Sequence, residues 1–247
     1  FADGRNELEV WMEDEEHHQI ENSESRKAFW IDSVRPVIGL EVSGGADIWH
    51  KEAAEVVVEA SDGSNGSQIA EIVCKTGEKI VGKSSKGAEK FVITESSQNG
   101  ESTTVTIIAT DYAGNQTVVT DRVFVDRDAP KALIQGVEDY TITSKPVQVS
   151  YLAEEENVIQ TVRANILKED IDGKKEETEI TEWKTKSRNE SGDTKKESVQ
   201  TLAEDGLYKL RMNVTDMAGN VSHAERQLII DKENPVIAHV DELDGKY

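Results

Sequence analysis

Alternating apolar and polar residues mark three similar segments of the chain. In each segment, apolar residues stand two, four and six positions before an aspartate, and these aspartates are Asp14, Asp111 and Asp216. The nine apolar positions are Leu8, Val10 and Met12, then Val105, Ile107 and Ala109, then Leu210, Met212 and Val214. A period of two over this length predicts a half-buried β-strand, and three aligned copies predict an internal repeat.

A second strand is expected after each of these aspartates. The second strands end in the apolar runs 29–31, 123–125 and 228–230. Each run is followed by an aspartate and, four residues later, by a proline; the pairs are Asp32 and Pro36, Asp126 and Pro130, and Asp231 and Pro235. A proline cannot donate a hydrogen bond to a sheet, so each strand is expected to end before it. Strand, turn and strand make a β-hairpin, and each hairpin is expected to close a domain.

The turn inside the hairpin has a recognisable chemistry in two of the three copies. Residues 111–115 read Asp-Tyr-Ala-Gly-Asn, and residues 216–220 read Asp-Met-Ala-Gly-Asn. In such a turn Asp accepts hydrogen bonds from nearby backbone N–H groups, Gly adopts a positive φ, and Asn tolerates the left-handed region. The first copy has His17 and His18 where Gly and Asn would stand. A role assigned to this turn therefore does not transfer to Asp14.

The spacing of the Asp-Pro pairs predicts the domain organisation. The three aspartates lie 94 and 105 residues apart, which is about the length of one β-sandwich domain. We therefore expect an all-β chain of tandem β-sandwich domains arranged end to end. Residues 1–35 would be the C-terminal hairpin of a preceding domain, 36–129 and 130–234 two complete domains, and 235–247 the first strand of a following domain. The chain would then be an internal piece of a longer array.

Two regions inside the expected domains are less regular. Residues 67–81 fit either a strand or a short helix, because their apolar positions suit both periods. Residues 168–200 are mostly polar and charged, and they predict a long hairpin with a mobile loop near residues 187–195. Trp49 and Tyr140 stand at equivalent positions of the two domains. A feature repeated in every unit serves the unit itself, so we interpret both as structural.

The charge of the chain narrows the classes of partner. The 247 residues include 49 Asp and Glu against 28 Lys and Arg, a formal net charge of −21, and the acidity is shared by all the expected segments. Such a surface repels nucleic acid and anionic membranes, and it keeps a long extracellular array soluble and self-repelling. No apolar run reaches the roughly 18 residues of a membrane helix, and no signal peptide opens the sequence. We expect a monomeric array with neither nucleic-acid binding nor membrane insertion.

The sequence offers no motif for covalent or hydrolytic catalysis. None of the patterns G-x-S-x-G, S-x-x-K and H-E-x-x-H occurs, and the histidines are scattered over different repeats. Those histidines are His17, His18, His50, His223 and His239. The single cysteine, Cys74, cannot form an intrachain disulfide and follows two apolar residues, so we interpret it as a buried small hydrophobe. We expect a non-enzymatic protein.

Two sequence runs carry a family resemblance. The run GLYKLRMNVTDMAGNVS, followed by QLIIDKENP, resembles the end of the bacterial Ig-like repeats of large, cell-wall-associated surface proteins of Gram-positive bacteria, notably gut Clostridia. The run TDYAGNQT, followed by VFVDRDAP, is a second copy. The resemblance implies tandem Ig-like β-sandwich domains at the bacterial cell surface. Repeats of this family serve as stalks, adhesins or ligand-binding modules, and some similar gut proteins bind antibody variable domains as B-cell superantigens.

Calcium is the cofactor that the carboxylates suggest. Two sets of oxygen-bearing residues are expected at two domain ends: Asp111, Asn115, Asp126 and Asp128, and Asp216, Asn220, Asp231 and Glu233. A cation held by such residues would stiffen the joint between domains. The favoured alternative is that Asp and Asn cap a turn while the other carboxylates are solvated. Residues 13–18, Glu-Asp-Glu-Glu-His-His, present the same choice between a transition-metal site and a solvated hairpin tip, and the solvated tip is favoured.

Three tryptophans are the candidate partner-binding residues. Trp11 and Trp30 each lie between two apolar residues, so they point away from the face that those neighbours bury. Trp183 has no counterpart in the other domain. Exposed aromatic residues are enriched at interface anchors, and edge strands allow strand addition. The alternative for Trp11 and Trp30 is packing on a neighbouring domain or on strands outside this sequence.

These observations support three hypotheses of function. The first is a surface array that binds a host protein, with immunoglobulin the most specific ligand that the resemblance implies. The second is a structural stalk or spacer of an adhesin. The third is a carbohydrate-binding surface module, which needs an exposed aromatic platform. Some adhesin domains of similar architecture also carry a Lys–Asn isopeptide bond, which requires a buried lysine beside an asparagine and an acid.

Overall fold

The chain folds into strands only, in the part that the structure describes. A computed structural model describes residues 2–64, 66–184 and 193–235. All regular elements in these residues are β-strands, so the all-β prediction is confirmed, and no helix there is long and apolar enough to cross a membrane. The chain divides into two compact units. Unit 1 is Phe1–Ser97 with Glu101–Asp126, and unit 2 is Gln98–Gly100 with Arg127–Tyr247.

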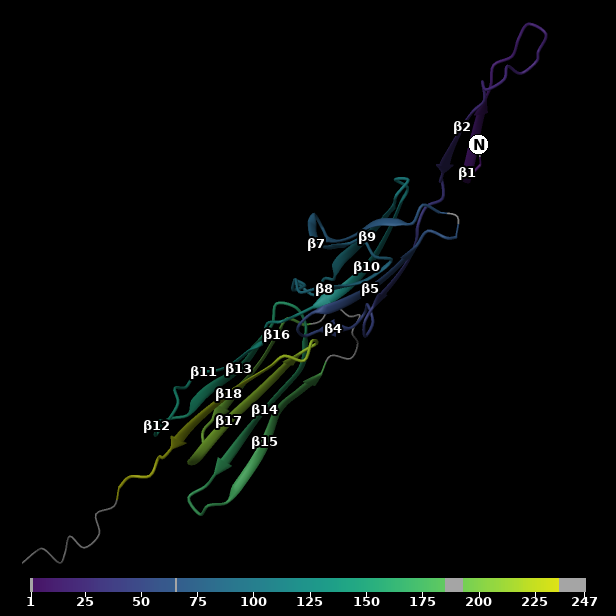
Figure 1. Cartoon of the computed structure of the whole chain (residues 1–247). Helices are drawn as coiled ribbons and strands as arrows, with labels where there is room; N and C mark the ends of the chain where they lie inside the picture. Colours follow the sequence, from purple (N-terminus) through teal and green to yellow (C-terminus); the bar gives the residue numbers. More distant parts are fainter. Residues whose placement is uncertain (1, 65, 185–192, 236–247) are drawn as a thin grey trace, which may run out of the picture. The chain divides into compact units, whose positions relative to one another are not determined.

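Unit 1 begins with a separate β-hairpin. Strand β1 (Gly4–Val10) pairs antiparallel with β2 (Ser25–Ile31), in a register that runs from Gly4 opposite Ile31 to Val10 opposite Ser25 (Figure 1). These two strands form a sheet of their own, so the apolar positions Leu8, Val10 and Met12 remain exposed. The expected hairpin within residues 1–35 is confirmed. Its assignment to a preceding domain stays a prediction.

The rest of unit 1 is a β-sandwich. One sheet has the order β4-β10-β9-β6-β7, and the other has the order β3-β5-β8. The strands of the first sheet are β4 (Trp49–His50), β6 (Ile69–Thr76), β7 (Lys79–Ser84), β9 (Thr103–Asp111) and β10 (Gln116–Val125). Those of the second are β3 (Val37–Val42), β5 (Ala54–Ser61) and β8 (Ala88–Ile93).

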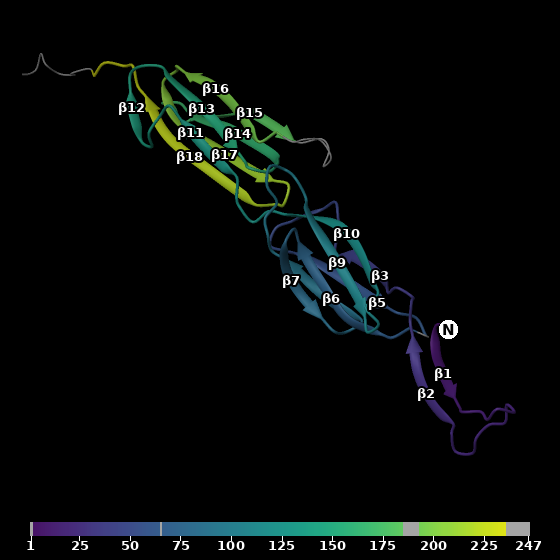
Figure 2. The same cartoon turned by 90° about the horizontal axis from the view of Figure 1, so that it is seen from above.

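Unit 2 repeats the same order strand for strand. Its sheets are β12-β18-β17-β14-β15 and β11-β13-β16 (Figure 2). The strands of the first sheet are β12 (Thr141–Thr143), β14 (Ile159–Glu169), β15 (Lys175–Lys184), β17 (Gly206–Asp216) and β18 (Val221–Ile230). Those of the second are β11 (Lys131–Gln135), β13 (Val147–Glu154) and β16 (Lys195–Leu202). The internal repeat inferred from the sequence is therefore a repeat of the whole fold.

The period-two apolar residues of the repeat form the cores. In unit 1, Val105, Ile107 and Ala109 on β9 are fully buried against residues of the facing sheet. In unit 2, Leu210, Met212 and Val214 on β17 take the same role. Each strand buries alternate side chains because successive residues point to opposite faces of a sheet. The alternation identified in the sequence thus determines which face of each hairpin packs against the facing sheet.

In both units, the short early strand pairs parallel with the last strand. Strand β4 places Trp49 opposite Phe124 and His50 opposite Val125 on β10. Strand β12 places Thr141 to Thr143 opposite Leu228 to Ile230 on β18. In each sandwich, therefore, the second strand lies beside the last strand and runs in the same direction.

The two irregular regions are now resolved. Residues 69–76 and 79–84 are the strands β6 and β7, so of the two alternatives for 67–81 the strand is correct. The hairpin expected over 168–200 is wrong, since β15 pairs with β14 in one sheet while β16 pairs with β13 in the other. The polar composition did not reveal that each of these strands is the edge of a different sheet. Most of the loop expected near 187–195 lies outside the described residues.

Truncation of Leu210 tests whether each unit depends on its own core. Leu210 is fully buried in unit 2, so Leu210→Ala is expected to lower the free energy of unfolding of unit 2 by about 2–5 kcal/mol. Hydrogen exchange resolved by peptide measures this separately for the two units. The control is Val118→Ala, which changes an exposed side chain of β10 and is expected to alter stability by less than about 0.5 kcal/mol. An equal loss of stability in both units would contradict separate cores.

Cys74 provides a second test of the packing in unit 1. The side chain is fully buried in β6, and burial raises the pKa of its thiol to about 11. The thiolate is the reactive form, so the native protein is expected to resist a thiol reagent such as Ellman's reagent at pH 8. The same protein in guanidinium chloride is expected to react fully. Rapid reaction of the native protein would mean that the core opens at this strand.

Candidate functional site

The Asp-x-Ala-Gly-Asn turns have the same geometry in both units. The Asp111 carboxylate accepts one hydrogen bond from the backbone N–H of Asn115 (2.8 Å) and one from its Nδ2 (2.9 Å). Asp216 accepts the same two bonds from Asn220, each 2.8 Å long. Gly114 and Gly219 have φ near +90°, as expected. The two asparagines do not adopt a positive φ, so they serve the turn through their side chains instead.

In unit 1, two further aspartates join this turn. Asp32 follows β2, Asp62 directly follows β5, and Asp111 ends β9. One carboxylate oxygen of each residue lies within 4.8 Å of those of the other two. We refer to Asp32, Asp62 and Asp111 as the three-aspartate cluster. It brings together three segments that are far apart in the sequence.

Backbone N–H groups hold two of these carboxylates in place. Asp32 Oδ2 accepts a hydrogen bond from the N–H of Ser67 (2.7 Å), and Asp62 Oδ2 accepts one from the N–H of Gln68 (2.9 Å). The carbonyl of Asp32 also accepts a hydrogen bond from Asn115 Nδ2 (3.1 Å). The loop that follows β5 and the turn that follows β9 therefore both hold Asp32.

The electrostatics of the cluster are unfavourable for three negative charges. Asp62 is only 6% exposed, and its Oδ1 is buried without a hydrogen-bond partner among the described residues. Burial raises the pKa of Asp62, and the charges of Asp32 and Asp111 raise it further. Hydrogen bonds from Ser67 lower the pKa of Asp32. The cluster thus combines an ionised carboxylate with a buried one that has an unsatisfied acceptor.

The grouping of the predicted calcium ligands is wrong. Asp111 and Asn115 precede β10, whereas Asp126 and Asp128 follow it, and a ten-residue strand spans about 33 Å. The two pairs therefore lie at opposite ends of unit 1's last strand. In the structure, the carboxylates that lie close to Asp111 are those of Asp32 and Asp62. Strand β18, also ten residues long, separates the other predicted set in the same way, with Asp216 and Asn220 before it and Asp231 and Glu233 after it.

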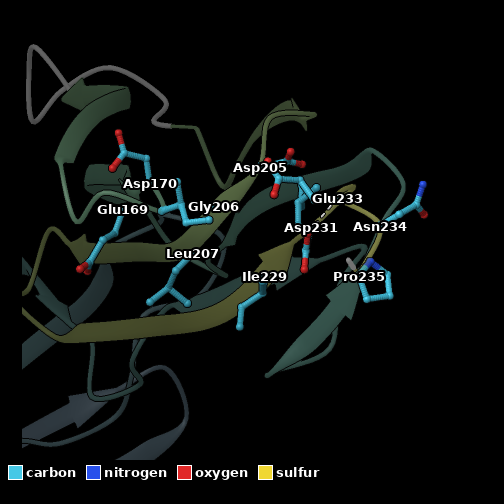
Figure 3. Close-up of a pocket in the computed structure, with 12 residues that line it drawn as sticks. Glu169, Asp170, Asp205, Gly206, Leu207, Ile229, Asp231, Glu233, Asn234 and Pro235 are labelled. Carbon is cyan, nitrogen blue, oxygen red and sulfur yellow. Dashed lines mark hydrogen bonds between the residues drawn. The ribbon is translucent and has the colours of Figure 1, made fainter. Parts of the chain in front are cut away.

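Asp231 and Glu233 line an open depression at the end of unit 2. Its volume is about 740 Å³, and Leu207 and Ile229 supply apolar surface (Figure 3). Its carboxylates are Glu169, Asp170, Asp205, Asp231 and Glu233. Apart from Asn234, the side chains that line it in the described part of the chain are acidic or apolar.

The tip of the first hairpin carries two of the five histidines, His17 and His18. His17 Nδ1 lies 3.4 Å from a Glu13 oxygen, and His18 Nδ1 lies 3.4 Å from an Asp14 oxygen. All four side chains are largely exposed. These contacts lie between solvent-exposed side chains, and contacts of this kind contribute less than about 1 kcal/mol.

The three candidate tryptophans have different environments. Trp30 is 71% exposed on β2, opposite Arg5 on β1. Trp11 is exposed as well, and its Nε1 donates a hydrogen bond to Glu13 (2.8 Å). Trp183 is partly buried against the core of unit 2, with the Lys196 ammonium 4.2 Å from its ring centre. The structure accounts for Trp183 as a packing residue and leaves Trp30 as the most exposed of the three.

The sequence contained a signal for Asp62 that the repeat analysis missed. Ala54, Val56, Val58 and Ala60 alternate along β5 as buried residues, and Asp62 is the next position of that series. A carboxylate in phase with a buried face requires a partner or a ligand. Asp32 had been identified only as the start of an Asp-Pro pair, because nothing local indicates which turn it meets.

One family model matches part of unit 2. Residues 156–232, from just before β14 to just beyond β18, match the family model of a bacterial Ig-like domain. A search of the curated proteins finds no match.

Several solved structures are similar at low identity. Fibronectin(III)-like modules of CbhA from Clostridium thermocellum are 11% identical, over 82% of this chain and 100% of that chain, with a TM-score of 0.33. A tetra-tandem repeat in the extending region of a large adhesion protein is 15% identical, over 94% of this chain and 57% of that chain, with a TM-score of 0.38. Carbohydrate-binding modules of the β-sandwich superfamily are 13% identical, over 80% and 97%, with a TM-score of 0.31.

Replacing Asp62 tests the electrostatics of the cluster. In metal-free solution at pH 7, Asp62→Asn is expected to stabilise unit 1 by about 1–3 kcal/mol, because it removes a buried charge and supplies an amide donor to the neighbouring carboxylates. The raised pKa means that folded wild-type protein binds the proton more tightly than unfolded protein does. The raised pKa of Asp62 therefore lowers the free energy of unfolding of the wild type. This loss is fully present above the pKa that Asp62 has in the folded state, and it disappears as the pH falls towards the value near 3.8 of the unfolded state.

Denaturant unfolding at pH 7 and at pH 4 measures this difference. The matched control is Asp170→Asn, in an exposed hairpin turn where the carboxylate accepts the backbone N–H groups of Asp172 and Lys174. The control is expected to leave unit 1 unchanged at both pH values. A variant Asp62→Asn that is less stable than the wild type at pH 7 would contradict the account of the cluster.

Proposed function

We propose that this chain is a load-bearing spacer within an extracellular bacterial surface protein, without enzymatic activity. The observation that carries the proposal is the parallel pairing of an early strand with the last strand in each unit. The match of residues 156–232 to a bacterial Ig-like domain supports the bacterial surface setting. The net charge of −21 supports a soluble, self-repelling array.

Parallel pairing determines how a unit responds to pulling. Tension reaches a unit through the chain that precedes its first strands and leaves through the chain that follows its last strand. Two parallel strands joined to opposite ends are then drawn past each other, so all the hydrogen bonds between them resist together. Those bonds include Asp126 N–H to the His50 carbonyl (2.9 Å) in unit 1, and Asp231 N–H to the Thr143 carbonyl (2.9 Å) in unit 2. A spacer under tension needs this arrangement in every unit.

Single-molecule force measurements test the spacer. When the chain is pulled by its termini, we expect two main unfolding events, each releasing on the order of 300 Å of chain. Asp231→Pro removes the N–H that bonds Thr143 and is expected to lower the unfolding force of unit 2 only. Asp231→Ala keeps that N–H and serves as the matched control. If the proline and alanine variants unfold at the same force, the parallel pair does not bear the load.

A second candidate function is the binding of a host protein, which the exposure of Trp30 favours. Trp30 shares its face of the hairpin with Arg5 and with the ion pair between Arg26 and Glu9. An aromatic ring among charged groups is a common centre of a protein interface. Immunoglobulin is the ligand implied by the sequence resemblance. Carbohydrate binding, the third hypothesis, stays a prediction.

Affinity capture from serum separates the two functions. If the chain binds immunoglobulin through Trp30, Trp30→Ala is expected to abolish capture and to leave stability within about 0.5 kcal/mol of the wild type. Trp183→Ala is the opposite control, expected to destabilise unit 2 without altering capture. Capture of no immunoglobulin by the wild-type chain would remove this second candidate and leave the spacer.

A further inference from the structure

We propose that the three-aspartate cluster of unit 1 is a calcium site. The ligands would be Asp32, Asp62 and Asp111. Of these, the sequence pattern predicted only Asp111 as a calcium ligand. Two separate observations support the site. One is the convergence of three carboxylates within 4.8 Å of one another. The other is the buried Asp62 Oδ1, which has no hydrogen-bond partner among the described residues.

The spacing of the oxygens suits a single calcium ion. Calcium binds oxygen at about 2.3–2.6 Å, so two ligand oxygens on opposite sides of one ion lie about 5 Å apart. The three carboxylates are within this limit, and one ion can therefore touch all of them. The remaining positions of a six- to eight-fold shell would be filled by water or by further oxygens of the same carboxylates.

The hydrogen bonds around the cluster orient the carboxylates and leave acceptor capacity free. Asp32 Oδ2 receives the N–H of Ser67, Asp62 Oδ2 receives that of Gln68, and Asp111 receives both donors of Asn115. A carboxylate has about four lone-pair sites, so each group keeps some available. Asp62 Oδ1 accepts no hydrogen bond from the described residues, so all of its lone-pair sites are available. Fixed outer bonds of this kind are typical of metal ligands, since they hold the ligand before the ion arrives.

The chemistry of the donors selects calcium. The cluster contains only carboxylate oxygens and no histidine or cysteine, which the later transition metals prefer. Magnesium usually binds one or two carboxylates and retains several waters, because it demands a near-ideal octahedron. Three carboxylates contributed by separate loops form the larger and less regular shell that calcium accepts. A divalent cation also neutralises most of a charge of −3 that is otherwise partly buried.

Calcium at this place would fasten the chain that leads into the sandwich. Asp32 lies in the segment between β2 and β3, whereas Asp62 and Asp111 belong to the ends of β5 and β9. An ion that binds all three cross-links three segments of the folded chain. The unfolded chain does not hold these residues together, so calcium binding stabilises the folded state.

The experiment uses the full chain, freed of metal with a chelator and then dialysed. Calorimetric titration with calcium is expected to show a saturable site with a Kd between about 10⁻⁵ and 10⁻³ M. Calcium at 100 times that Kd is expected to raise the melting temperature of unit 1 by about 5 °C or more. Terbium gives an independent readout, because Trp30 lines the same depression as Asp32 and can sensitise its emission. Added calcium should displace the terbium and abolish that emission.

Substitutions connect the effect to the cluster. Asp62→Asn is expected to weaken calcium binding at least tenfold and, at the same calcium concentration, to reduce the calcium-dependent rise in the melting temperature of unit 1 by about half or more. Asp32→Asn, at a partly exposed position, is the second variant and is expected to act in the same direction. Asp170→Asn, in the turn of unit 2, is the control and should bind calcium as the wild type does.

Three results would overturn the proposal. The first is a melting temperature of unit 1 that calcium does not change. The second is unaltered calcium affinity in both Asp62→Asn and Asp32→Asn. The third is equal stabilisation by magnesium at the same concentration, which would assign the cluster to divalent cations in general. None of these results bears on the spacer, whose test concerns the strand pair closed by Asp231.

Discussion

The structure depends on one constraint: each unit must close two sheets around a core while its last strand lies beside one of its first. Closure buries the alternating residues of β9 and β17, and the parallel pairs β4–β10 and β12–β18 tie the two ends of each unit together. These pairs are short, with two and three residues in register. Their importance comes from position, because each pair joins the second strand of a sandwich to its last strand.

The same closure concentrates acidic groups at the ends of the strands. Turn residues such as Asp111 satisfy backbone donors, and this explains why an Asp-x-Ala-Gly-Asn turn recurs in both units. In unit 1, however, the turn meets two more carboxylates, and Asp62 is left with an unpaired buried oxygen. Hydrogen bonding within the turn therefore explains the pairing of Asp with Asn, but it does not explain why three aspartates lie together. A bound cation explains the difference, since it satisfies the oxygen that the protein leaves unpaired.

Local patterns in the sequence predicted the elements better than they predicted the contacts. Period-two alternation identified the strands around Ile107 and Met212, since burial of alternate residues is a local property. The partners of β15 and β16 were not predictable in this way, because polar edge strands carry little information about which sheet they join. The calcium residues were misgrouped for a geometric reason: Asp111 and Asp126 are close in sequence, but the strand between them carries them to opposite ends of unit 1. Asp62 could have been found from its phase with the buried face of β5.

The direction dependence of the unfolding force tests the central claim most directly. Unit 2 can be pulled either through the chain termini or through attachment points at Lys145 and Lys232, which follow β12 and β18 at the same end of the parallel pair. Pulling through the termini draws the two strands past each other, whereas pulling at these lysines peels them apart one bond at a time. The account predicts an unfolding force several-fold higher through the termini. Equal forces in the two directions would contradict it.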